Sequence, residues 1–234
     1  MCSAAARLNR RAAAQPYAPK LKAMILCDSC QVASHPLLRH KLTFLRDKNV
    51  APKEFRELSK EIATLLAYEA MADLPTISRS VSTPIKDTIG EEISTKIAFV
   101  PIMRSGLGMV DGFVYAFPMA QVWHLGIYRD TKTLVPIEYY NRFTTDATCQ
   151  VAYVLDPTLS CGAVARGAVK AVKDWGVSKI KLVTFVASPE GIKAFQDEHP
   201  DVDIVTASID EGLDSEHMVT PGLGDVGCRF FASA

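Results

Sequence analysis

The sequence lacks any apolar run long enough to cross a bilayer. No hydrophobic stretch among its 234 residues approaches the roughly 20 residues that a membrane helix needs. An excess of charge is absent too, because 26 Lys and Arg residues balance 26 Asp and Glu residues. A formal charge of zero argues against bulk attraction to nucleic acid. We therefore expect a soluble protein with a small-molecule partner and no role at a membrane.

Cysteine is sparse, and the chain is too long to need disulfides for stability. Six cysteines are scattered through it, which suits a reducing, cytoplasmic compartment. Cys27 and Cys30 form a C-x-x-C pair, but neither a second pair nor a histidine cluster with the spacing of a zinc site accompanies it. We interpret this pair as ordinary thiols of an irregular segment rather than as a metal or redox site.

Acidic residues are missing from the first 27 positions. This alanine-rich segment carries only basic charges, at Arg7, Arg10, Arg11, Lys20 and Lys22. Some organelle-targeting leaders share that composition, and a plain basic extension is the alternative that we favour. We assign residues 1–31 to an irregular basic leader and residues 32–234 to one folded domain.

The rest of the chain reads as an α/β domain. Apolar residues at helical spacing predict helices over 36–47 and 54–70, whereas the polar stretch 78–95 predicts a short strand pair or a loop. Short apolar runs then alternate with helical segments. We expect strands over 97–102, 121–127, 151–155, 179–187 and 204–209, with helices beginning at Gly106 and ending at Trp175 and Glu198. This alternation predicts a mostly parallel sheet flanked by helices.

Polar residues follow these strands at their carboxyl ends, where such sheets bind ligands. The strand 151–155 leads through Asp156 into a loop of small residues and then a helix. Backbone N–H groups and the positive end of the helix dipole favour a bound phosphate there. Asp156 would repel the phosphate, so hydroxyls or a metal are its expected partners. An ordinary strand-to-helix turn is the alternative for this loop.

Two arginines occupy equivalent places after neighbouring strands. Arg104 stands beside Gly106 and Gly108, and its planar guanidinium suits two parallel hydrogen bonds to phosphate; a surface arginine is the alternative. Arg129 opens a polar segment that reaches Thr148. A connection of this length is typical of a lid or arm, although a β-hairpin with solvated charges explains it equally well.

The segment 217–227 contains Gly and Pro at several positions and has Asp225 as almost its only polar side chain. The contacts that it offers a ligand must therefore come from its backbone groups. A simple chain-terminal loop is the alternative for this segment taken alone.

Taken together, these motifs resemble the uracil phosphoribosyltransferases, which have the type I phosphoribosyltransferase fold. The resemblance covers nearly the whole domain. It rests on His35–Leu42, Phe55–Leu58, Tyr68–Leu74, Pro101–Met109, Gly126–Arg129, Asp156-Pro157, Ala187–Gly191, Ala207–Asp210 and Pro221–Asp225.

The resemblance implies an α/β domain with a small hood and a protruding β-arm or lid. It also implies transfer of ribose 5-phosphate from phosphoribosyl pyrophosphate to N1 of uracil, giving UMP and pyrophosphate in pyrimidine salvage. Arg104, Arg129, Asp156 and Asp225 would be catalytic. Further residues that would bind phosphoribosyl pyrophosphate are Pro157, Thr158, Leu159, Ser160, Cys161, Gly162, Ala163 and Val164. Those that would hold uracil are Val219, Gly224, Asp225 and Val226, whose backbone edge can match the acceptor, donor, acceptor pattern of uracil.

The resemblance also implies Mg²⁺ held mainly through the substrate, a homodimer or homotetramer, and GTP as an effector in some members. The sequence departs from the family pattern in its phosphate loop, where Cys161 and Val164 replace two hydroxyl residues. Val226 replaces an alanine near the base, and Thr131-Lys132 replaces an acidic pair in the lid. These departures keep open a second function, that of a catalytically weak or inactive nucleotide-binding regulator.

Overall fold

The computed structural model describes residues 29–130, 133 and 135–233. Its helices are α1 (Pro36–Arg46), α2 (Pro52–Ala70), α3 (Leu107–Ala116), α4 (Ala163–Trp175), α5 (Pro189–Glu198) and α6 (Val226–Phe231). The longer strands are β4 (Ile97–Met103), β6 (Leu125–Arg129), β7 (Pro136–Asn141), β8 (Val151–Leu155), β10 (Lys179–Ala187) and β11 (Asp203–Ile209). Shorter or peripheral strands are β1 (Cys30–Val32), β2 (Ile77–Ser82), β3 (Asp87–Glu92), β5 (Gln121–Val122), β9 (Thr158–Leu159), β12 (Gly212–Leu213) and β13 (Val219–Thr220).

A central sheet organises the chain. Its strand order in the described residues is β1-β11-β10-β8-β4-β6-β7, with β5 added to β4 and β9 added to β10. Every pairing is parallel except that between β6 and β7. The predicted mostly parallel sheet is therefore confirmed. The strand expected over 121–127 is two strands, β5 and β6, which pair with different parts of β4.

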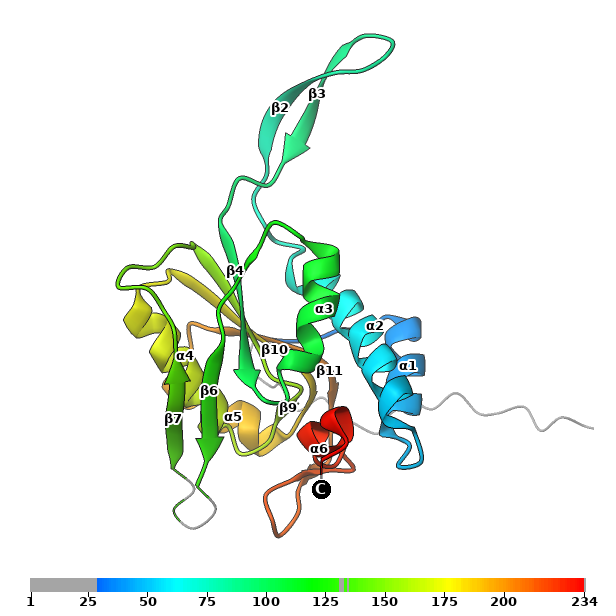
Figure 1. Cartoon of the computed structure of the whole chain (residues 1–234), viewed down its shortest axis with the longest axis vertical. Coiled ribbons are helices and arrows are strands. Elements are labelled where there is room, and N and C mark those ends of the chain that lie inside the picture. Colours follow the sequence, from blue (N-terminus) through cyan, green and yellow to red (C-terminus); the bar gives the residue numbers. More distant parts are fainter. Residues whose placement is uncertain (1–28, 131–132, 134, 234) are drawn as a thin grey trace, which may run out of the picture.

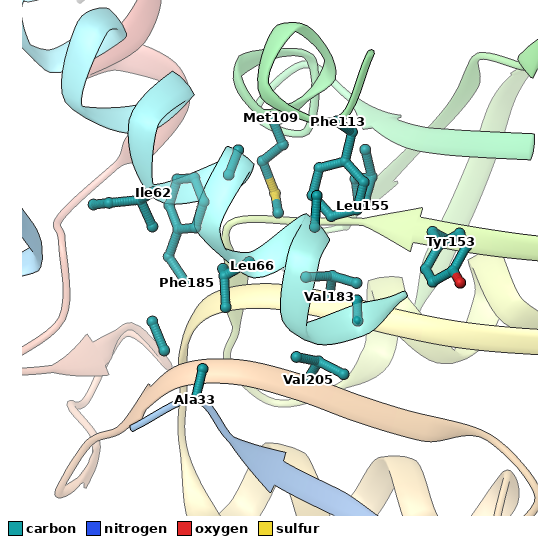
Figure 2. Packing of buried hydrophobic residues seen from close by; sticks show 14 of the residues in the cluster. Ala33, Ile62, Leu66, Met109, Phe113, Tyr153, Leu155, Val183, Phe185 and Val205 are labelled. Atoms are coloured by element: carbon teal, nitrogen blue, oxygen red, sulfur yellow. The ribbon is translucent and has the colours of Figure 1, made fainter. Parts of the chain in front are cut away.

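Helices cover both faces of this sheet. Alternate side chains of each strand point to opposite faces, so Tyr153 and Leu155 pack beneath α2 and α3, whereas Ala152 and Val154 pack beneath α4. Figure 2 shows the first of these layers, with Leu66 of α2 packed among side chains of α3 and of the sheet. The apolar runs of the sequence are continuous because both faces of the strands are buried.

Two antiparallel hairpins extend from the sheet. The β2–β3 hairpin confirms the strand pair expected over 78–95, and it projects from the end where β4 begins (Figure 1). The β6–β7 hairpin points the opposite way, toward the end where the parallel strands finish (Figure 1). The polar segment after Arg129 thus forms part of the β6–β7 hairpin. Of the two hairpins, only this one lies at the carboxyl edge of the sheet. Thr131 and Lys132 lie outside the described residues.

The first described strand bears on the expected boundary at residue 32. β1 pairs with β11, so Cys30 and Gln31 already belong to the sheet. Residues 1–28, which hold Cys27 and the basic cluster of the leader, lie outside the described residues. Within the described part of the chain, no helix is both long and apolar enough to span a membrane.

Close contact between α2 and α3 depends on a glycine. A Cβ atom at Gly112 would lie 2.5 Å from the carbonyl oxygen of Lys60 and 2.8 Å from the backbone nitrogen of Thr64. Both are helix backbone atoms that cannot rotate away. Gly112 therefore sets the distance between the two helices that cover one face of the sheet.

We expect Gly112→Val to force α3 away from α2 and to lower the free energy of unfolding by about 1–3 kcal/mol, as overpacking does. Gly90→Val is the matched control, because a Cβ at Gly90 would meet its nearest atom at 3.8 Å. Urea denaturation of the two variants measures the difference. Equal stability of both would contradict the role of Gly112.

Candidate functional site

A cavity of about 180 Å³ opens at the carboxyl edge of the sheet, between the end of β4 and the first turn of α4. It lies where the sequence placed its polar motifs. The lining residues are Ile102, Met103, Ser105, Ile127, Asp156, Thr158, Leu159, Ser160, Gly162, Val164 and Ala165. Seven of them belong to the segment 156–165, so the predicted phosphate loop forms most of the wall.

Hydrogen bonds to β10 hold the start of this loop. The backbone N–H of Asp156 donates to the carbonyl of Val183 at 3.1 Å, and the carbonyl of Pro157 accepts from the N–H groups of Phe185 and Val186. Thr158 and Leu159 then pair with β10 as β9. The loop consequently follows the neighbouring strand and has a defined backbone path rather than an irregular one.

The end of the loop rests on the N-terminus of α5. The hydroxyl of Ser188 donates to the carbonyl of Ser160 at 2.7 Å and accepts from the N–H of Gly191 at 2.9 Å. A Cβ at Gly191 would overlap the carbonyl oxygen of Ser160 at 1.9 Å. Gly162 follows with φ at 79°, a left-handed conformation that favours glycine, and α4 starts at the next residue.

The first turn of α4 therefore borders the cavity. Ser160, Gly162 and Val164 all line it. The first N–H groups of a helix have no partner within that helix and carry its positive dipole end. The arrangement can bind a phosphate group.

Asp156 is a buried carboxylate in the wall of the cavity. It is 8% exposed, and the hydroxyl of Ser105 donates to its Oδ1 at 3.4 Å. Burial raises the pKa of Asp156 to about 7, although hydrogen bonds from the Thr158 N–H and Ser105 lower it in part. The loop containing Ser105 approaches closely because Gly106 has no side chain: a Cβ there would lie 2.3 Å from the carbonyl oxygen of Leu155.

Arg129 connects the phosphate loop to the opposite wall of the site. Its Nη1 lies 3.3 Å from the sulfur of Cys161, and its Nη2 donates to the carbonyl of Glu216 at 3.3 Å. Burial would raise the pKa of the Cys161 thiol, but the N–H of Ala163 and the guanidinium of Arg129 outweigh this and hold that pKa below its usual value. The Cys161 sulfur thus interacts with a cation.

Arg104 directly follows β4, between two residues that line the cavity, Met103 and Ser105. Its side chain is exposed, and its Nη1 is 3.5 Å from the hydroxyl of Ser233. Asp225 caps α6 by accepting a hydrogen bond from the N–H of Cys228 at 2.8 Å. The hydrogen bond with the Asp225 carboxylate raises the pKa of the Cys228 thiol, although Ser233 and the charge of Arg104 lower it in part.

The expected uracil segment forms a small hood beyond β11. Val219 and Val226 are buried, whereas Gly224 is exposed, has φ at 68°, and has open space where a Cβ would point. Gly222, with φ at 60°, is held tightly, because a Cβ there would lie 2.0 Å from the carbonyl oxygen of Val219. The hood therefore presents accessible backbone at Gly224 on a constrained turn.

Sequence reasoning missed the residues that support these loops. Ser188 was not singled out, and Asp210 was quoted only as part of a motif. Arg46 pairs with Asp210 at 2.6 Å across 164 residues of sequence. The position of Asp210 directly after a strand was the available signal.

The expectation that Mg²⁺ is held mainly through the substrate stays a prediction. Across the described residues, no group of three or more His, Cys, Asp and Glu side chains has the arrangement of a metal site. Asp156 and Asp225 each contribute a single carboxylate, the first in the cavity wall and the second at the start of α6. A cation held mainly by the phosphates of a substrate fits this donor set, whereas a dedicated protein cage does not.

Comparison with known proteins agrees with the geometry. The family model for uracil phosphoribosyltransferase matches residues 32–233. A uracil phosphoribosyltransferase of Pediococcus pentosaceus is 47% identical over 87% of this chain and 98% of its own length, and one of a Roseiflexus species is 46% identical over 86% and 97%. The solved structure of the AQ2163 protein from Aquifex aeolicus superposes with a TM-score of 0.83 at 32% identity, covering 88% of this chain and 99% of that one. This chain belongs to the uracil phosphoribosyltransferase family.

Proposed function

We propose that this protein is a uracil phosphoribosyltransferase that transfers ribose 5-phosphate from phosphoribosyl pyrophosphate to N1 of uracil, releasing pyrophosphate and forming UMP for pyrimidine salvage. The observation that carries the proposal is the cavity formed by the 156–165 loop, in which a buried carboxylate adjoins the first turn of a helix. A sugar phosphate needs both, since its phosphate seeks N–H donors and its hydroxyls seek an acceptor. Family membership supports the same assignment.

Asp156 would accept hydrogen bonds from the ribose hydroxyls, and the backbone from Thr158 to Val164 would bind the 5-phosphate. A Gly162 backbone in the left-handed region turns the loop into α4, so that consecutive N–H groups converge on one point. The apolar walls at Ile102 and Ile127 limit water at the reacting carbon.

Charge stabilisation would dominate the reaction. As the bond from C1 to pyrophosphate breaks, the ribose gains oxocarbenium character and negative charge grows on the leaving group. Arg104, directly after β4, and Arg129, at the end of β6, would bind that charge, together with Asp225 through the magnesium complex. Mg²⁺, when bound with the substrate, would neutralise part of the charge on the pyrophosphate. The β6–β7 hairpin that contains Arg129 would act as the lid.

Uracil would bind at the hood, against Val219 and the backbone of 224–226. Cytosine has an amino group where uracil has an acceptor, so a backbone N–H there would be left without a partner. The open space beside Gly224 supports close approach of a ring.

The remaining expectations from the resemblance stay predictions. Exposed apolar side chains support a homodimer or homotetramer, since Ile85 on the β2–β3 hairpin is 94% exposed and Met119 is 85% exposed. Cys149, Cys161 and Cys228 are free thiols, which supports a cytoplasmic location. GTP as an effector rests on the resemblance alone.

Base selectivity tests the function directly. Purified protein is mixed with magnesium, phosphoribosyl pyrophosphate and, separately, uracil, cytosine, hypoxanthine or orotate. We expect nucleotide only with uracil, and its loss in Arg104→Met. Chromatographic detection of a nucleotide from another base, or of none from any base, would contradict the proposal.

A second prediction concerns Cys161. A hydroxyl donates to phosphate better than a thiol, so Cys161→Thr should lower the KM for phosphoribosyl pyrophosphate by roughly 10- to 100-fold, the effect of one charge-assisted hydrogen bond of about 1.5–3 kcal/mol. Cys161→Val has the same shape without a donor, and we expect its KM to be no lower than that of the natural protein. Initial rates at saturating uracil measure both constants. An unchanged or higher KM in the threonine variant would remove this explanation.

A third prediction follows from the raised pKa of Asp156, about 7. Because the folded state binds this proton more tightly than the unfolded state, stability is greatest below the ordinary carboxyl pKa and falls as the pH rises through 7. Relative to Asp156→Asn, the natural protein should lose roughly 2–4 kcal/mol of unfolding free energy between about pH 4 and pH 8. Denaturation at several pH values measures this difference, and a pH-independent difference would be inconsistent with it.

A further inference from the structure

The end of α1 and the end of β11 meet in a cluster of ionic hydrogen bonds next to the hood. Arg46 is the last residue of α1, and Asp210 directly follows β11. Nη1 and Nη2 of Arg46 donate to Oδ2 and Oδ1 of Asp210 at 2.7 and 2.6 Å. The side chain of Asp210 is only 2% exposed and that of Arg46 is 24% exposed. A two-pronged ion pair of this kind has a fixed geometry.

Both members of this pair also bind the same residue of the hood. Arg46 Nη1 donates to the carbonyl of Gly222 at 2.8 Å, and the N–H of Gly222 donates to Asp210 Oδ2 at 2.9 Å. One peptide residue is thus held through its donor and its acceptor at once. Ser208 completes the cluster by donating to Asp210 Oδ1 at 2.8 Å.

The residue so held lies in the turn that the hood depends on. Gly222 follows the Thr220–Pro221 pair and precedes Leu223 and Gly224, and both of these glycines have positive φ. The next carbonyl, that of Leu223, accepts from Arg229, which also donates to the carbonyl of Asp47 at the end of α1. Two consecutive residues of the hood are therefore attached to the same helix end.

We propose that Arg46 and Asp210 are positioning residues for base recognition: through Gly222, their ion pair fixes the hood backbone that receives uracil, without touching the base. This rests on the proposed function. A backbone edge discriminates between bases only if its N–H and C=O groups hold their places, because a mobile edge can adapt to either pattern. The ion pair orders that turn in the free protein, so binding of the base does not have to lower the conformational entropy of the turn.

Kinetics separate this role from general support of the fold. Arg46→Met keeps the apolar stem of the side chain and removes the guanidinium donors. We expect the KM for uracil to rise roughly 10- to 100-fold, the range for loss of ionic hydrogen bonds, while the KM for phosphoribosyl pyrophosphate changes less than about twofold. Arg46→Lys keeps the positive charge but cannot form two parallel hydrogen bonds. Its KM for uracil should lie between those of the natural protein and Arg46→Met. The ratio of rates with uracil and cytosine should fall in the methionine variant.

A control exists at the other end of the sheet. Asp73 accepts from Lys179 and Lys181 at 2.7 and 2.6 Å, two ionic contacts away from the cavity, although its side chain is 47% exposed and that of Asp210 only 2%. We expect Asp73→Asn to leave both KM values unchanged even where it lowers the Tm. Asp210→Asn combined with Arg46→Met should raise the KM for uracil no further than the more severe single variant, since both act through one residue.

Hydrogen exchange provides a readout that does not need turnover. We expect the amides of residues 219, 220 and 222–224 to exchange faster in Arg46→Met and Asp210→Asn than in the natural protein and in Asp73→Asn. Should the methionine variant be insoluble, Arg46→Gln and Asp210→Asn serve the same comparison. A parallel rise of both KM values, or unchanged exchange in the hood, would overturn the proposal. If the natural protein forms no UMP, the proposed function fails, and the exchange measurement alone decides whether the ion pair orders the hood.

Discussion

The pairing of the 156–160 segment with β10 is the constraint on which the site depends. A strand that simply ended at Leu155 would release an irregular loop, but the N–H of Asp156 and the carbonyl of Pro157 continue to bond to β10. Ser188 then binds the carbonyl of Ser160. The carboxylate and the first turn of α4 therefore keep a fixed separation, as a substrate with a hydroxyl face and a phosphate end requires.

The sequence predicts the layers of the fold well, because burial on both faces leaves a clear pattern. The runs at Val151–Leu155 and Lys179–Ala187 coincide with β8 and β10. The run at 121–127 was predicted as one strand because β5 and β6 are separated by only Trp123 and His124, too short a break to stand out in the sequence. The sequence does not show that β5 and β6 pair with different parts of β4, because this depends on the register of strand pairing.

The site was predictable where its chemistry lies in contiguous motifs, and less so where it depends on distant contacts. Asp156 and its loop were recognisable from one stretch of sequence. The ion pair between Arg46 and Asp210 joins residues 164 positions apart. A single arginine at a helix end is ordinary, and only the fold shows that it faces a buried carboxylate.

Two buried carboxylates of the same edge illustrate how surroundings decide a role. Asp210 is surrounded by donors from Arg46, Ser208 and Gly222, so its charge is compensated within the protein and it can serve as a fixed anchor. Asp156 has only the Thr158 N–H and a long contact from Ser105, and burial raises its pKa to about 7. An acceptor whose partners are incomplete gains most from the hydroxyls of a ligand. Asp210 therefore stabilises the protein, whereas Asp156 is available for substrate, although both directly follow a buried strand.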